Sequence, residues 1–168
     1  MEKRGVIFGY GDGRFGPNNP VTRAQFGSMV VRTLDGSSAD ADRMKGYKNP
    51  FKDPKGYEAH HYNILRISQM GITLGTTATT YSPERNISRA QVITMIMRSE
   101  PAKKWNQPAA GSFTKCDKTH LENVRKANAN GMLAGLDNGN NPGRDYDFNA
   151  RATRAEVALM LYNLMRKR

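Results

Sequence analysis

The sequence predicts a mainly α-helical fold built from three related helix–loop–helix units. A four-residue pattern recurs at nearly constant spacing, as Thr22-Arg23-Ala24-Gln25, Ser88-Arg89-Ala90-Gln91 and Thr153-Arg154-Ala155-Glu156. A pair of glycines four residues apart precedes each copy, at Gly5 and Gly9, Gly71 and Gly75, and Gly131 and Gly135. Repetition at a fixed period indicates repeated structural units that pack on one another.

Each four-residue pattern predicts the start of a helix. Thr22, Ser88 and Thr153 are favourable N-cap residues, and the Gln or Glu three positions later completes a capping box. Apolar residues at helical spacing follow, for example Phe26, Met29, Val30 and Leu34. The methionine six positions after each arginine is predicted to be a core residue, at Met29, Met95 and Met160.

A second helix is predicted upstream of the glycine pair in the second and third units, at about residues 56–70 and 118–130. Each should end at the first glycine of its pair, where a positive φ is easily reached. The predicted segments are repeat one at 1–36, a linker at 37–50, repeat two at 51–100, a linker at 101–112 and repeat three at 113–168.

The first repeat lacks this upstream helix, since only four residues precede Gly5. We therefore expect the apolar face formed by Phe26, Met29 and Val30 to need a cover. A second chain, a homo-oligomer or a bound segment could supply it.

The composition favours an acidic partner. The net charge is +11, from 26 Lys and Arg against 15 Asp and Glu. No apolar run approaches the ~20 residues of a membrane span, so no membrane insertion is expected. No signal-peptide pattern is visible at the start, so an export signal is expected outside this sequence. The single cysteine, Cys116, excludes an intramolecular disulfide.

The repeated residues resemble the S-layer homology domain family. Its Gly-Tyr-x-Asp-Gly loop is similar to Gly9-Tyr10-Gly11-Asp12-Gly13, and its Thr-Arg-Ala-Glu motif to the three four-residue patterns. The family's upstream helix opens near a Phe-x-Asp, as at Phe51-Lys52-Asp53, but its tryptophan is replaced here by His60 and His120.

The resemblance implies a pseudo-threefold bundle that anchors proteins to the cell wall, with no enzymatic activity and no cofactor. It implies that an anionic polysaccharide, commonly pyruvylated, binds in grooves between repeats, with the motif arginines as carboxylate ligands. The implied ligand-binding residues are Arg23, Arg89, Arg154, Gly9, Gly75, Gly135, Asp12 and Tyr10. Secondary candidates are Thr22, Ser88, Thr153, Gln25, Gln91, Glu156, His60 and His120.

The positions of the arginines give a separate argument for a bound anion. A cation in the first helical turn opposes the helix dipole. Free backbone N–H groups and the guanidinium could together hold one carboxylate. The alternative is that each arginine pairs with an internal partner, such as Asp12, Glu156 or a loop carbonyl.

Other functions have weaker support in the sequence. A nucleic-acid binder would rest only on net charge and the basic tail Arg166-Lys167-Arg168, so no nucleic-acid partner is expected. The histidines lack the spacing of a metal site, and residues 137–147 resemble a calcium loop without its glycine and closing glutamate. An assembly module remains the alternative to the polysaccharide anchor.

Overall fold

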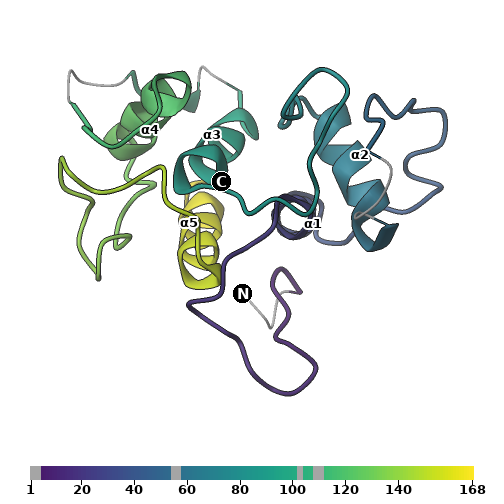
Figure 1. The fold of residues 1–168 in the computed structure, drawn as a ribbon, viewed down its shortest axis with the longest axis horizontal. Helices are drawn as coiled ribbons and strands as arrows, with labels where there is room; N and C mark the ends of the chain where they lie inside the picture. Colours follow the sequence, from purple (N-terminus) through teal and green to yellow (C-terminus); the bar gives the residue numbers. More distant parts are fainter. Residues whose placement is uncertain (1–4, 54–57, 102–103, 108–111) are drawn as a thin grey trace.

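A computed structural model describes residues 5–53, 58–101, 104–107 and 112–168. Within these ranges the chain is helical and contains no β-strand, which confirms the predicted mainly α fold. The elements are α1 (Arg23–Asp35), the 3-10 turn η2 (Glu58–His60), α2 (His61–Gln69), α3 (Arg89–Arg98), α4 (Lys118–Ala129) and α5 (Arg154–Lys167). In Figure 1, α1, α3 and α5 lie towards the middle of the molecule, while α2 and α4 flank them.

The predicted helix starts are confirmed. α1, α3 and α5 follow Thr22, Ser88 and Thr153, and each start has a complete capping box. In α1, for example, the Gln25 N–H donates to Thr22 Oγ1 at 3.2 Å, and the Thr22 N–H donates to Gln25 Oε1 at 3.1 Å. Each box uses two donors that would otherwise lack a partner within the helix.

The upstream helices end at the first glycine of each pair, as predicted. α2 is followed by Gly71, with φ +71°, and α4 by Gly131, with φ +68°. In both cases the next N–H reaches back to the helix, from Ile72 to Ile67 O and from Met132 to Ala127 O. This is the Schellman arrangement, which needs a left-handed residue. The first turn of the helix predicted at 56–70 is instead a 3-10 turn, and residues 56 and 57 lie outside the described ranges.

Three backbone hydrogen bonds join the repeats in a closed ring. The Val21 N–H donates to Ala152 O at 3.1 Å, that of Ala152 to Ile87 O at 2.9 Å, and that of Ile87 to Val21 O at 2.9 Å. All three side chains are fully buried. Each of the three residues directly precedes an N-cap, so the ring gathers the starts of α1, α3 and α5. The pseudo-threefold symmetry stays a prediction, which this ring supports.

The helices pair across repeats, so the prediction that the α1 face is exposed and left for a second chain or bound segment to cover is wrong, because α2 of the same chain covers it. Phe26, Met29 and Val30 are at most 3% exposed. α2, from the second repeat, packs on α1 of the first, and α4 packs on α3 in the same way. The upstream helix of one repeat therefore covers the downstream helix of the repeat before it.

Buried apolar side chains from all three repeats form one core cluster. The predicted core methionines belong to it: Met29 is 3% exposed, Met95 4% and Met160 1%. The segments between repeats also contribute, through Met44 and Trp105. The indole N–H of Trp105 donates to Met97 O at 3.0 Å. The segment boundaries themselves stay a prediction. None of the helices in the described residues is long and apolar enough to cross a membrane.

Candidate anion-binding site

The three motif arginines hold neighbouring repeats together. Each guanidinium stacks on an aromatic ring of the next loop, and the third closes back onto the first. The centroid distances are 4.8 Å for Arg23 over Tyr81, 4.6 Å for Arg89 over Tyr146, and 4.8 and 5.1 Å for Arg154 over Tyr10 and Phe15. Such contacts orient the cation without neutralising its charge.

Arg23 and Arg154 donate to neutral oxygens. The Arg23 Nε donates to Tyr81 O at 2.8 Å, and the Tyr81 hydroxyl donates to Arg23 O at 2.7 Å. Arg154 donates from Nε to Phe15 O at 2.8 Å and from Nη2 to Phe8 O at 2.6 Å. Both residues are only 4% exposed. Burial lowers the pKa of Arg23, as expected for a desolvated cation.

Arg89 differs because it has an acidic partner. Its Nε and Nη2 donate to Glu156 Oε1 at 2.9 and 2.6 Å. Burial alone would raise the pKa of Glu156, but the hydrogen bonds from Arg89 and Thr153 lower it below its usual value. The internal pairing considered from the sequence is therefore found at all three arginines, with a carboxylate at Arg89 and with loop carbonyls at Arg23 and Arg154. The charge of Arg89 is already compensated within the protein.

The backbone N–H groups at the three helix starts are not free, so that part of the sequence argument is wrong. The amides of Arg23, Arg89 and Arg154 donate to loop carbonyls of Arg85, Ala150 and Asn19. Those of the following alanines donate to Pro83, Phe148 and Pro17. The next amide in each helix donates to its N-cap side chain. Any anion bound at these helix starts would therefore have to be recognised by side chains.

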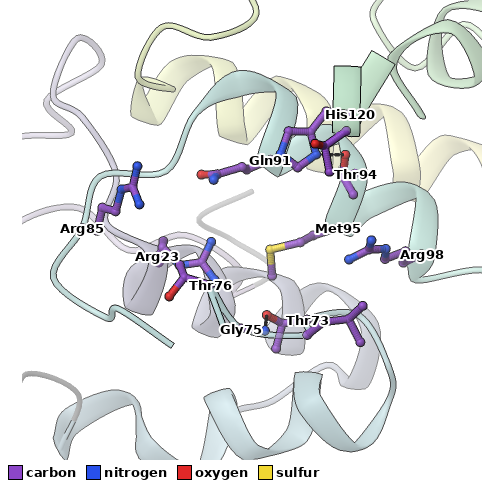
Figure 2. Close-up of a pocket in the computed structure, with 12 residues that line it drawn as sticks. Arg23, Thr73, Gly75, Thr76, Arg85, Gln91, Thr94, Met95, Arg98 and His120 are labelled. Carbon is purple, nitrogen blue, oxygen red and sulfur yellow. Dashed lines mark hydrogen bonds between the residues drawn. The ribbon is translucent and has the colours of Figure 1, made fainter. Parts of the chain in front are cut away.

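A cleft of about 250 Å³ lies beside Arg23, and we call it the Arg23 cleft. Figure 2 shows Arg85 and Arg98 at opposite sides of it, with Gln91 and His120 along one edge and Thr73, Gly75 and Thr76 along the other. Its walls come from all three repeats: Arg23 belongs to the first, Gly75 to the second and His120, in α4, to the third. The residues lining it include three arginines and no carboxylate. A second hollow adjoins it, sharing Arg85, Gln91 and His120.

The corresponding positions in the other two repeats make internal contacts, although Asn163 also lines a separate hollow of about 250 Å³ with Arg166 and Lys167. Nine residues after the motif arginine, α1 carries Arg32, which donates to Val6 O at 3.1 Å and stacks on Phe8. α5 carries Asn163 there, and its amide donates to Met132 O and Ala134 O, each at 3.1 Å. In α3 the same position is Arg98, which is exposed and lines the cleft.

The two candidate histidines make matching contacts with the downstream helices. His60 Nδ1 lies 2.8 Å from Ser28 Oγ, and His120 Nδ1 lies 2.9 Å from Thr94 Oγ1. Burial lowers the pKa of both imidazoles below the usual value. Ser28 Oγ also accepts from the Asn63 amide at 3.0 Å, so its own proton is available to a neutral imidazole. Of the two, only His120 lines the Arg23 cleft.

The remaining predicted residues divide between structural roles and the cleft. Asp12 accepts from Arg14 Nε at 2.6 Å, in the loop whose Tyr10 and Phe15 stack on Arg154. Tyr10 stacks on Arg154. Gly75 lines the cleft, whereas Gly9 and Gly135 occupy the corresponding loops of the other repeats. Thr22, Ser88, Thr153, Gln25 and Gln91 form the capping boxes, and Gln91 also reaches the cleft.

The sequence reasoning missed Arg85 and Arg98. A signal existed for Arg98, because Arg32 stands at the same repeat position in the first unit. Arg85 lies four residues before its motif arginine, where the other repeats have Asn19 and Ala150, so repetition could not reveal it.

A metal centre has no support in the part of the chain that the structure describes. No group of three or more His, Cys, Asp or Glu side chains is placed there to hold an ion. In the loop that resembles a calcium site, Asp145 accepts from the Thr114 hydroxyl and Asp147 from two backbone amides. These carboxylates stabilise the turn.

The fold and site define a class of protein: a helical three-repeat module joined by arginine–aromatic contacts around a basic cleft. Residues 1–26 and 50–93, less than half of the chain, match the family model of the S-layer homology domain. The third repeat lies outside that match and is assigned by its internal similarity.

Similar proteins include longer surface proteins and enzymes. The chain is 27% identical to an amylopullulanase of Thermoanaerobacterium thermosulfurigenes over 99% of this chain and 9% of the relative. It is 31% identical to a cellulosome-anchoring protein of Acetivibrio thermocellus over 59% of this chain and 22% of the relative. It is 26% identical to a surface layer protein of Brevibacillus choshinensis over 59% of this chain and 9% of the relative.

The chain thus spans a small part of the length of the relatives it matches. The family match and these relatives support a cell-wall anchoring module at the cell surface.

Proposed function

We propose that the chain anchors a surface protein non-covalently by binding an acidic wall polysaccharide, and that the Arg23 cleft takes its carboxylate-bearing sugar. The observation that carries this proposal is the charge of the cleft. Three arginines line it without a carboxylate among the lining residues, and the hydrogen bond of Arg23 goes to a neutral carbonyl, with the Asp53 carboxylate as its nearby acidic group. A pyruvyl carboxylate would compensate that charge, and guanidinium groups bind carboxylates with directed hydrogen bonds.

The three grooves are unequal in this proposal. Arg89 is already neutralised by Glu156, and Arg32 covers the loop beside Arg154. The Arg23 cleft therefore contributes most of the affinity. The module itself has no catalytic role, and the enzymatic activity in the names of some relatives belongs to other parts of those longer chains.

The test compares variants that leave the fold intact. Arg85 and Arg98 are exposed, so an Arg85→Ala/Arg98→Ala variant should keep its helical circular dichroism and melting temperature. Its affinity for a purified pyruvylated wall polymer, measured by calorimetry, should fall at least about tenfold, because each charged hydrogen bond contributes roughly 1.5–3 kcal/mol. A Lys45→Ala/Lys48→Ala variant removes the same charge outside the cleft and should bind normally.

Gln91→Glu sharpens this test. In α5 the same capping position holds Glu156, which neutralises Arg89 while keeping the helix start intact. A glutamate at 91 should neutralise Arg23 in the same way and lower polymer affinity without loss of stability. Equal binding by all these variants, or equal binding to polymer stripped of pyruvyl groups by mild acid, would show that the cleft is not the carboxylate site.

A further inference from the structure

His120 lies where two surface hollows meet. It lines both the Arg23 cleft and the second hollow that adjoins it. Figure 2 shows His120 beside Thr94 at the edge of the cleft. The charged side chains that line the two hollows are four arginines and one carboxylate, at Arg23, Arg85, Arg98, Arg151 and Asp117. An imidazolium at this position is therefore surrounded mainly by charges of its own sign.

One ring nitrogen of His120 is held by α3, and the other is available to a ligand. His120 Nδ1 lies 2.9 Å from Thr94 Oγ1, within hydrogen-bonding distance. No group of the described residues forms a hydrogen bond with Nε2. A hydroxyl both donates and accepts, so Thr94 can donate to the neutral ring and accept from the protonated one. The ring can therefore keep its position in both protonation states, with Nε2–H as a donor.

His60 occupies the same repeat position in different surroundings. Its Nδ1 contacts Ser28 Oγ at 2.8 Å, which matches the contact between His120 and Thr94. Burial and Arg32 lower its pKa, and Glu84 raises it. His60 lines neither of the two hollows. The two histidines thus share their hydroxyl contact, but only His120 joins it to the Arg23 cleft.

The free chain disfavours the charged form of His120. Burial lowers its pKa below the usual value of 6.5. Asp117 opposes this effect, whereas Arg98 and Arg23 add to it. The remaining arginines of the two hollows act in the same direction, because like charges disfavour a cation. The ring is therefore neutral at pH 7.5 when no ligand is bound.

We propose that His120 is a proton-linked ligand residue of the Arg23 cleft, whose imidazole takes up a proton when an acidic sugar binds. This inference rests on the proposed function of the cleft. A carboxylate bound there would bring the opposite charge that favours the imidazolium. Ligand binding and protonation then promote each other, as linked equilibria must. The affinity for the acidic polysaccharide therefore rises as the pH falls towards the pKa of the free imidazole.

Calorimetry with a purified pyruvylated wall polymer at pH 7.5 and pH 5.5 tests this inference. The affinity of the unaltered chain should be about fivefold higher at pH 5.5. The ligand keeps its charge in this range, since carboxyl groups titrate at about pH 4. His120→Asn, whose amide can keep the contact with Thr94, should remove most of the rise. His60→Asn is the matched control and should retain it.

A nuclear magnetic resonance titration of the His120 ring gives a second measurement, and its pKa should be higher with bound polymer than without. Equal affinities at the two pH values, a rise that His120→Asn retains, or an unchanged ring pKa would overturn the inference. Failure of the proposed function looks different, because Arg85→Ala/Arg98→Ala would then bind as tightly as the unaltered chain at both pH values. No binding at either pH value would overturn both.

Discussion

At the scale of single residues, one neighbouring side chain decides whether the charge of a motif arginine is compensated by a carboxylate. Arg89 meets a carboxylate at Glu156, whereas the same capping position next to Arg23 is the neutral Gln91. The motif is nearly identical in the three repeats, so the difference in charge compensation comes from its last residue. Exchanging Glu and Gln at positions 91 and 156 therefore tests directly how neutralising a motif arginine affects stability and binding.

Glu156→Gln should lower the free energy of unfolding by about 2 kcal/mol, since it removes a charged hydrogen-bond partner from a mostly buried arginine. The helix start should survive, because glutamine occupies this position in α1 and α3. Urea denaturation measures the change. Glu122→Gln, at an exposed ion pair with Lys126, is the control and should change stability by less than about 0.5 kcal/mol. Equal losses would contradict the role of burial.

His60 and His120 should make stability depend on pH below neutrality. Burial lowers the pKa of both relative to the usual 6.5, so the unfolded chain binds more protons as the pH falls. Their contribution is complete above about pH 6.5 and declines as the pH drops through that value. The urea midpoint should therefore be lower at pH 5.5 than at pH 7.5.

A His60→Asn/His120→Asn variant should lose less stability between the same two pH values. The carboxyl groups with shifted pKa, among them Glu156, have lowered values and titrate below this window. An unchanged pH dependence in the double variant would show that other groups are responsible.

At the scale of elements, the first glycine of the second and third pairs ends the upstream helix, and the second glycine of repeat two, Gly75, lines the Arg23 cleft. Gly75 has φ +80°, and a Cβ there would lie 2.4 Å from Thr77 O and 2.6 Å from Thr80 O. Gly36 has nearly the same φ, +78°, but no atom within 4 Å of a Cβ. Substitution at Gly36 therefore measures backbone strain alone, whereas substitution at Gly75 measures strain together with a steric clash.

Gly36→Ala should cost about 1–2 kcal/mol, the usual penalty for a left-handed alanine. Gly75→Ala should cost more than about 3 kcal/mol, because backbone atoms must also move. Chemical denaturation of the two variants gives the comparison. Equal costs would mean that the loop at Gly75 relaxes freely.

At the scale of the whole molecule, the repeats depend on one another. The ring of Val21, Ile87 and Ala152 closes only when all three helix starts are in place. The arginine contacts also run from each repeat to the next, and the last returns to the first. A single repeat would lose both sets of contacts.

We therefore expect one cooperative unfolding transition. The calorimetric enthalpy should equal the van't Hoff enthalpy, at roughly 120 kcal/mol near 60 °C for a chain of this length. Scanning calorimetry gives both values. Two resolved transitions, one retained after removal of residues 113–168, would contradict this interdependence.

The sequence by itself determined the local features of this protein. The capping boxes, the glycine helix ends and the core methionines follow from residues within a few positions of each other, so their spacing was sufficient to predict them. The resemblance of the repeated motif likewise indicated the family. Only the tertiary structure decided which partner each arginine meets, since Arg23 and Tyr81 are 58 residues apart and Arg154 and Phe8 are 146 apart.

The sequence predicted an uncovered face on α1, but in the tertiary structure α2 covers α1, and the more exposed downstream helix is α5. The reason is that helices pair between repeats rather than within them. It showed that the amides at the helix starts are already bonded to loop carbonyls, which no spacing in the sequence reveals. Long-range contacts of this kind depend on how the three units close around a common centre. That closure, rather than the motif alone, leaves the Arg23 cleft open and without a carboxylate among the residues that line it.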